Sequence, residues 1–208
     1  THEKINEKAI ITGYLSNTFK FDVQYFRNPD WAISNMVRTL TYAADWSKES
    51  TTIISYSDIV YSPLAIDLFV NSNEGTDISL LYDPDWRNLW ELRFENPLDD
   101  AETFTHTNGI LTGIGEKTDS IDKIQGQFMG LIKITPRGWI LLQEYLNNLT
   151  IEEINKLDCT SLIKNLLKMG VQIGLTPIKD QWFELDSEED LNLYLKHAHK
   201  NDIFKKLL

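Results

Sequence analysis

The first half of the chain alternates between two hydrophobic periodicities. Apolar residues recur at helical spacing over residues 35–46, where Ser34 suits the N-cap, and again after Pro63, which favours the first turn of a helix. Short apolar and β-branched runs predict strands at residues 8–14, 22–28, 51–56 and 78–82. This alternation predicts a doubly wound α/β domain with a mixed, mostly parallel sheet and right-handed crossovers.

The second half of the chain adds an antiparallel feature. Residues 102–106 and 109–116 predict a β-hairpin, because the Asn108-Gly109 pair between them is a strong turn signal. Further strands are predicted at residues 128–134, 171–177 and 182–185, and further helices after Pro136 and Thr150, at residues 161–168 and after Ser187. No repeat or linker is evident, so residues 1–208 are interpreted as one domain.

Composition narrows the class of protein. The net charge of −11 argues against a nucleic-acid-binding protein, whose binding surface is usually basic. No apolar run reaches membrane-spanning length, which argues against a membrane partner. The single cysteine, Cys159, excludes an internal disulfide and fits the reducing cytoplasm. We therefore expect a cytoplasmic globular protein.

Two aspartates stand where predicted strands end. Asp58 follows the β-branched run at residues 53–57, and Asp186 follows the apolar run at residues 182–185. Ligands of open α/β sheets bind at the carboxyl ends of the strands, and two carboxylates there can hold one Mg²⁺ against a nucleotide phosphate. Ordinary capping is the alternative for both residues, since aspartate is common at turns and helix starts. The acids that follow Asp186, at positions 188–190, are interpreted as solvated residues of a first helical turn.

Five ordered motifs resemble those of the nucleotidyltransferases that make nucleotide-activated sugars and alcohols, most closely the cytidylyltransferases acting on phosphocholine or 2-aminoethylphosphonate. The motifs are NPDWAISNM at residues 28–36, YSDI at 56–59, GEK at 115–117, GQFMGL at 126–131 and WFELD at 182–186. The family opens with a strand, a Gly-rich loop that grips the triphosphate, and a helix, and no part of this chain matches that unit. We expect that the chain is N-terminally incomplete, and that a missing segment or a second chain completes the sheet.

The resemblance implies a reaction and a set of site residues. CTP and a phospho- or phosphono-alcohol would give a CDP-linked product and pyrophosphate. Asp58 and Asp186 would bind Mg²⁺, Lys117 would reach the acceptor phosphate, Glu116 would face the substrate, and the helix that begins near Asn35 would face the active site. The Pro that usually follows the lysine is Thr118 here.

The tryptophan-rich stretch after residue 85 is a candidate acceptor pocket. Trp86 and Trp90 could line a cage for a cationic group by cation–π attraction, with Glu102 among the acids that add charge. Ordinary core packing is the alternative for each aromatic residue.

Three other functions remain open. The chain could act on a sugar 1-phosphate, or be a non-catalytic subunit that keeps the fold. It could also be a glycosyltransferase that uses the Asp-x-Asp pair Asp83 and Asp85.

Overall fold

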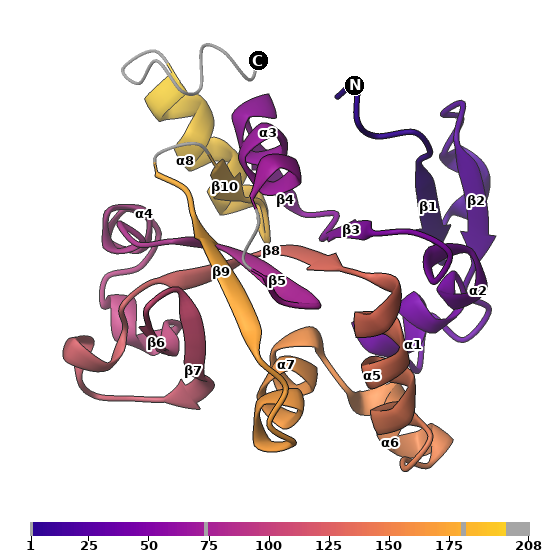
Figure 1. The fold of residues 1–208 in the computed structure, drawn as a ribbon. Coiled ribbons are helices and arrows are strands. Elements are labelled where there is room, and N and C mark those ends of the chain that lie inside the picture. The colour runs from indigo at the N-terminus through magenta and orange to yellow at the C-terminus, as the bar shows by residue number, and fades with distance from the viewer. Residues whose placement is uncertain (1, 73–74, 180–181, 199–208) are drawn as a thin grey trace. The chain divides into compact units, whose positions relative to one another are not determined.

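The computed structural model describes residues 2–72, 75–179 and 182–198, and their Cα atoms cluster into two compact units (Figure 1). The first unit comprises Thr1–Thr52 and Ile134–Val171, and the second comprises Ile53–Lys133 and Gln172–Leu208.

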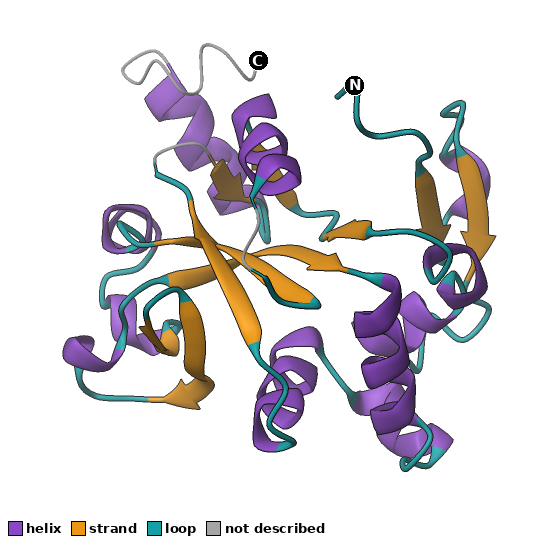
Figure 2. Ribbon diagram, in the orientation of Figure 1, coloured by secondary structure: helices purple, strands orange, loops and turns teal. Residues whose placement is uncertain are grey.

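The first unit combines a small sheet with helices (Figure 2). Strands β1 (Ala9–Thr12) and β2 (Gln24–Arg27) pair in parallel. The helices are α1 (Met36–Thr41), α2 (Ala44–Ser47), α5 (Pro136–Leu146), α6 (Ile151–Lys156) and α7 (Cys159–Lys168), and a 3₁₀ turn spans Ser16–Thr18. Apolar side chains at helical spacing on α1, α5 and α7, among them Val37, Trp139 and Ile163, are at least 99% buried.

The second unit is built on a six-stranded mixed sheet in the order β3-β8-β5-β9-β7-β6. Its strands are β3 (Thr52–Ser55), β8 (Gln127–Ile134), β5 (Ile78–Asp83), β9 (Ile173–Pro177), β7 (Ile110–Lys117) and β6 (Glu102–Thr107). Strands β5 and β9 pair in parallel, whereas β7 pairs antiparallel with both β9 and β6. Every residue of β5 is buried, as expected for a central strand with a continuous apolar run.

A two-stranded antiparallel ladder accompanies this sheet. It joins β4 (Ile59–Tyr61) to β10 (Trp182–Glu184). Figure 1 shows α3 (Pro63–Asn71) and α8 (Glu188–Ala198) close to these two strands. Helix α4 (Arg87–Arg93) and two 3₁₀ turns, at Pro97–Asp99 and Ile121–Lys123, complete the unit.

The core of the second unit lies where the ladder, α3, α4 and the sheet meet. Its most buried members include Phe69 from α3, Leu81 from β5 and Leu131 from β8, which are fully buried. Trp86, Trp90 and Trp182 belong to the same cluster. The site residues described below are therefore attached to a packed framework.

Most predicted elements are present with boundaries shifted by a few residues, and three local predictions are confirmed. Asn108 and Gly109 both have positive φ and turn the β6–β7 hairpin, as the sequence predicts. Thr150 and Glu153 form the predicted capping box of α6, and Pro63 occupies the first turn of α3.

Three predictions about elements are wrong or incomplete. The N-cap of α1 is Asn35, whose Oδ1 accepts from the N–H of Met36, while the Ser34 hydroxyl accepts from Asn28. Strand β4 was not predicted, because three apolar residues carry no periodicity of their own. Strands β1 and β2 pair with each other and do not join the six-stranded sheet, since a local strand pattern does not specify which edges meet. None of the helices in the described ranges is long and apolar enough to cross a membrane.

Candidate functional site

The β4–β10 ladder brings Asp58 and Asp186 to the same end of two paired strands. Ile59, the first residue of β4, pairs with Glu184, the last residue of β10. Beyond that pair, the main-chain N–H of Leu185 donates to the carbonyl oxygen of Asp58 over 2.8 Å. Asp58 and Asp186 thus flank the end of one antiparallel ladder, although they lie 128 positions apart in the sequence. Both are exposed, so their carboxylates are open to a ligand.

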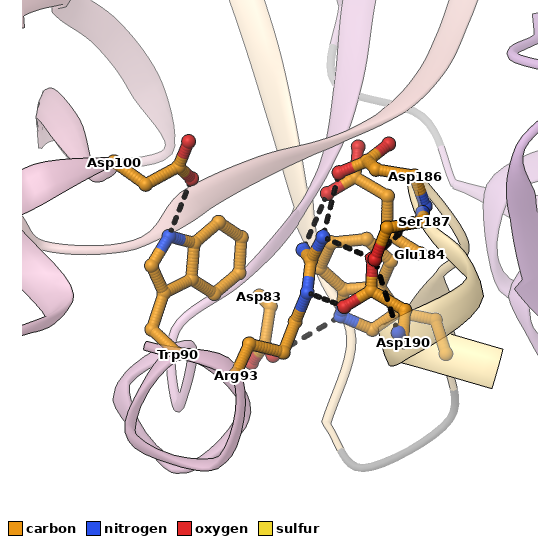
Figure 3. Close-up of polar contacts among 9 residues, drawn as sticks. Asp83, Trp90, Arg93, Asp100, Glu184, Asp186, Ser187 and Asp190 are labelled. Carbon is orange, nitrogen blue, oxygen red and sulfur yellow. Dashed lines mark hydrogen bonds and ion pairs between the residues drawn. The ribbon is translucent and has the colours of Figure 1, made fainter. Parts of the chain in front are cut away.

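Asp186 is held by Arg93, the last residue of α4. The Nη2 atom of Arg93 donates to Asp186 Oδ2 over 2.6 Å, and its Nη1 donates to Glu184 Oε2 over 2.8 Å. Its Nε and Nη2 donate to the two carboxylate oxygens of Asp190 over 2.9 and 3.2 Å. Figure 3 shows the guanidinium among these three carboxylates. Only 3% of the Arg93 side chain is exposed, so this cation is buried and fully engaged by acids.

Asp190 also caps the N-terminus of α8. Its Oδ2 accepts from the main-chain N–H groups of Asp186 and Ser187, and the Ser187 hydroxyl accepts from the N–H of Asp190. The predicted Ser187 cap is confirmed. The interpretation of Asp190 as a solvated acid is wrong, because it is 7% exposed and binds Arg93, whereas Glu188 and Glu189 are exposed.

The ion pairs shift the pKa values of this cluster. Burial, with the nearby charges of Asp186 and Asp58, raises the pKa of the Glu184 carboxyl despite its hydrogen bond from Arg93. Burial opposes ionisation of Asp190 too, but hydrogen bonds from Arg93 and Ser187 lower its pKa. Burial alone would lower the pKa of Arg93, and its hydrogen bonds to Asp190, Asp186 and Glu184 raise it instead. Arg93 therefore stays a cation.

The β6–β7 hairpin carries a second group of predicted site residues. Lys117 ends β7 opposite Glu102, the first residue of β6. The Lys117 Nζ atom donates to the main-chain carbonyl oxygens of Asp99 and Asp100 over 3.4 and 3.2 Å. Glu116 and Lys117 are exposed, and the Glu116 N–H donates to the hydroxyl of Thr103. The hairpin register therefore brings the predicted site residues Glu102, Glu116 and Lys117 to one end of the hairpin.

Trp86 and Trp90 are core residues in this structure, 3% and 4% exposed. The indole N–H of Trp86 donates to the carbonyl oxygen of Ile124, and that of Trp90 donates to Asp100 (Figure 3). These contacts correspond to the packing alternative stated for the aromatic stretch. A cation cage at these two residues stays a prediction.

Asn35 lies in the first unit, whereas the other predicted site residues lie in the second. Its side chain caps α1, and its main-chain N–H donates to the carbonyl oxygen of Asn155 over 2.7 Å. This is the structural role that aspartate, serine and asparagine side chains commonly have at helix starts.

The Asp-x-Asp pair has structural contacts. Asp83 is 5% exposed, and its carboxylate accepts from the N–H of Asp85 and from the indole N–H of Trp182. Asp85 forms an ion pair with Lys179 over 3.1 Å. Asp83 is therefore a buried turn and core residue, which disfavours its use as a metal ligand of a glycosyltransferase.

The two carboxylates of Asp58 and Asp186 fit a Mg²⁺ ion whose remaining ligands come from a nucleotide and from water. Among the described residues, no three His, Cys, Asp or Glu side chains are grouped to hold a metal ion. Mg²⁺ bound with nucleotides usually takes one or two carboxylates, with phosphate oxygens and waters completing its shell. Two exposed carboxylates flanking one ladder end suit that arrangement and not a closed protein cage.

Comparisons with known proteins identify the family. No model of a known protein family matches the chain. The CTP:phosphoglutamine cytidylyltransferase of Campylobacter jejuni is 30% identical over an alignment of 209 positions, which covers 92% of this chain and 82% of the relative. The chain belongs to the cytidylyltransferase family. It is therefore a nucleotidyltransferase, as the sequence motifs predicted.

Solved structures agree on the fold of this cytidylyltransferase. The inositol-1-phosphate CTP transferase of T. maritima superimposes with a TM-score of 0.67 at 13% identity, over 89% of this chain and 66% of that one. A putative glucose-1-phosphate thymidylyltransferase of Bacillus anthracis superimposes with a TM-score of 0.63 at 15% identity, over 88% of this chain and 72% of that one. The predicted α/β fold of nucleotide-diphospho-sugar transferase type is confirmed.

Sequence reasoning missed Arg93 and its contacts with Glu184 and Asp190. One signal was available: four of the five residues from position 186 to 190 are acidic, and such a density of negative charge favours a nearby counterion. The identity of that counterion, 93 positions away from Asp186, is visible only in the fold.

Proposed function

We propose that this chain transfers a cytidylyl group from CTP to a small phosphorylated acceptor of the phosphoglutamine type and releases pyrophosphate. One observation carries the proposal: the β4–β10 register places Asp58 and Asp186, both exposed, at one ladder end. The 30% identity to a CTP:phosphoglutamine cytidylyltransferase supports the choice of nucleotide and of acceptor class.

The acceptor phosphate is the nucleophile in this proposal. Its second ionisation lies near pH ~6, so one of its oxygens is anionic at neutral pH and needs no general base. That oxygen forms a bond to the α-phosphorus of CTP while the bond between the α-phosphorus and the bridging oxygen to the β-phosphate breaks. Pyrophosphate leaves with that electron pair, and atoms and charge balance without a further reactant. The protein contributes positioning and electrostatic stabilisation.

Asp58 and Asp186 would hold Mg²⁺ together with phosphate oxygens of CTP. When bound, the ion would neutralise charge on the triphosphate. The two carboxylates also repel an unaccompanied triphosphate, so the chain should bind CTP poorly without a divalent cation.

Lys117 is the proposed contact for the acceptor phosphate. Two of the three N–H donors of its ammonium are used by the carbonyl oxygens of Asp99 and Asp100. One donor therefore stays available, and the two carbonyls restrict the direction in which it points. Such a restrained point charge suits an incoming phosphate oxygen.

The character of the acceptor follows from what surrounds Lys117. Glu116 is an exposed carboxylate and Glu102 a half-buried one on the same hairpin, whereas Trp86 and Trp90 are buried. Exposed carboxylates pair with a primary ammonium or an amide N–H, whereas a quaternary ammonium prefers exposed aromatic faces. We therefore favour phosphoglutamine over phosphocholine, with 2-aminoethylphosphonate as the second candidate.

A pyrophosphate-release assay tests the proposal. Phosphoglutamine, 2-aminoethylphosphonate, phosphocholine and glucose 1-phosphate are each incubated with CTP, UTP or dTTP and Mg²⁺. Release with CTP and phosphoglutamine, abolished by EDTA, is the expected result. Turnover of glucose 1-phosphate alone would identify a sugar-phosphate enzyme, and no turnover with any pair would favour a non-catalytic subunit.

A further inference from the structure

Arg93 bonds three carboxylates in the segment that carries Asp186. Glu184 ends β10, Asp186 lies in the connection after it, and Asp190 lies in the first turn of α8. One guanidinium bonds all three carboxylates, through Nη1, Nη2 and Nε, over 2.6 to 3.2 Å (Figure 3). The connection between β10 and α8 is therefore pinned to the end of α4 at three successive points.

The three carboxylates differ in exposure, and that difference separates their roles. The Asp190 side chain is 10% exposed and that of Glu184 is 24% exposed, whereas that of Asp186 is 51% exposed. Asp190 and Glu184 face the guanidinium and the protein interior. Asp186 gives one oxygen to Arg93 and keeps half of its surface open to solvent.

Arg93 therefore fixes Asp186 relative to Asp58. The carbonyl oxygen of Asp58 is bonded to the residue before Asp186, which sets the main chain. The guanidinium, itself oriented by Glu184 and Asp190, restrains the Asp186 side chain through its bond from Nη2 to Oδ2. A carboxylate held in one rotamer binds a cation without the entropy cost of first being ordered.

We propose that Arg93 is a positioning residue that holds Asp186 in its cation-binding orientation beside Asp58. This inference rests on the proposed function and extends it to a residue that makes no contact with substrate. Arg93 acts through the Asp186 carboxylate, and the bidentate grip of Asp190 anchors Arg93 in turn.

The test distinguishes a role of Arg93 in orienting Asp186 from a role in stabilising the fold alone. Arg93→Lys keeps the positive charge, but an ammonium cannot reproduce three bonds in fork geometry. Arg87→Lys is the matched control, because Arg87 lies on the same helix and makes an exposed ion pair with Glu91. Thermal unfolding reports the fold of each variant. Mn²⁺, which takes the same oxygen ligands as Mg²⁺, is titrated into the substrate-free protein, and water-proton relaxation measures its affinity.

Arg93→Lys should retain a cooperative unfolding transition but bind Mn²⁺ about 10- to 100-fold more weakly, the loss typical when the partner of a metal ligand is removed. Arg87→Lys should bind Mn²⁺ as the wild type does. If Arg93→Lys also binds Mn²⁺ as the wild type does, while Asp58→Asn and Asp186→Asn bind it weakly, Arg93 is only a structural residue. If the wild type shows no Mn²⁺ binding that depends on these aspartates, this inference fails, and the pyrophosphate-release assay alone decides the proposed function.

A second variant covers the case in which Arg93→Lys does not fold. Asp190→Asn keeps the Arg93 and Asp186 side chains but weakens the bidentate bond that orients the guanidinium, together with the bonds that Asp190 accepts from the N–H groups of Asp186 and Ser187. Its Mn²⁺ affinity should fall in the same direction by a smaller factor. An unchanged affinity in folded Asp190→Asn would overturn the positioning role.

Discussion

The carbonyl oxygen of Asp58 accepts a hydrogen bond from the main-chain N–H of Leu185, at the end of the β4–β10 ladder. The bond is between main-chain atoms, so its geometry does not depend on either side chain. The placement of the two exposed aspartates at this ladder end is therefore a property of strand register, and substitution of the Asp58 carboxylate can test function without disturbing the fold.

Asp58→Asn should lower kcat by at least about 100-fold, which corresponds to about 2.7 kcal/mol of lost transition-state stabilisation. Its midpoint of thermal unfolding should stay close to that of the wild type, because the side chain is exposed. Pyrophosphate release and calorimetry measure the two quantities. Glu188→Gln is the control, an exposed first-turn acid of α8 that should leave kcat unchanged. A kcat within a few-fold of wild type for Asp58→Asn contradicts its assignment.

Lys117→Met should raise the KM for the phosphorylated acceptor by about tenfold, since one charge-assisted hydrogen bond to phosphate contributes about 1.5 kcal/mol. The KM for CTP should change much less. Initial rates with each substrate varied in turn measure both constants. The exposed Lys123, in the 3₁₀ turn Ile121–Lys123, supplies the control Lys123→Met. Equal changes in both KM values would show that Lys117 does not serve the acceptor.

The two indoles at Trp90 and Trp182 offer a matched comparison of stability. Both are at most 6% exposed, and each donates one hydrogen bond to a carboxylate. Asp100, the acceptor for Trp90, is exposed, whereas Asp83, the acceptor for Trp182, is 5% exposed. Trp182→Phe should therefore cost about 1 to 2 kcal/mol more free energy of unfolding than Trp90→Phe, because a buried acceptor loses a donor that water cannot replace. Urea titration measures both, and the reverse order would contradict the argument.

Acid should remove a stabilising contact in the first unit. Asp30 accepts from the hydroxyl of Tyr42 over 2.6 Å and from Arg38 over 3.3 Å, and these bonds lower its pKa below the usual range. A lowered folded-state pKa gives stability that is complete above the unfolded value of about 3.9 and is lost as pH falls through the folded value. The gap in stability between wild type and Asp30→Asn should therefore be constant near neutral pH and close in acid. A gap that widens below pH ~4 would show the opposite linkage.

How far the sequence predicts this molecule depends on the range of the interactions involved. The Asn108-Gly109 turn and the capping box of Thr150 with Glu153 are determined within four residues and are correct, whereas the predicted cap at Ser34 is one residue off. Asp58 and Asp186 were predicted to meet, but the strand that joins them, β4, was not, since its three residues have no pattern apart from their partner β10. Arg93 was missed for the same reason: its three acids lie 91 to 97 positions away.

The position of Trp90 and Arg93 on one helix has a consequence for substrate affinity. They lie about one turn apart on α4. Trp90 donates to the Asp100 carboxylate, and the Asp100 carbonyl oxygen accepts from Lys117. Arg93 donates to Asp186. A small movement of α4 would therefore change the proposed acceptor contact and the proposed nucleotide contact at once. We expect the affinity for each substrate to depend on whether the other is bound, by the same factor in both directions.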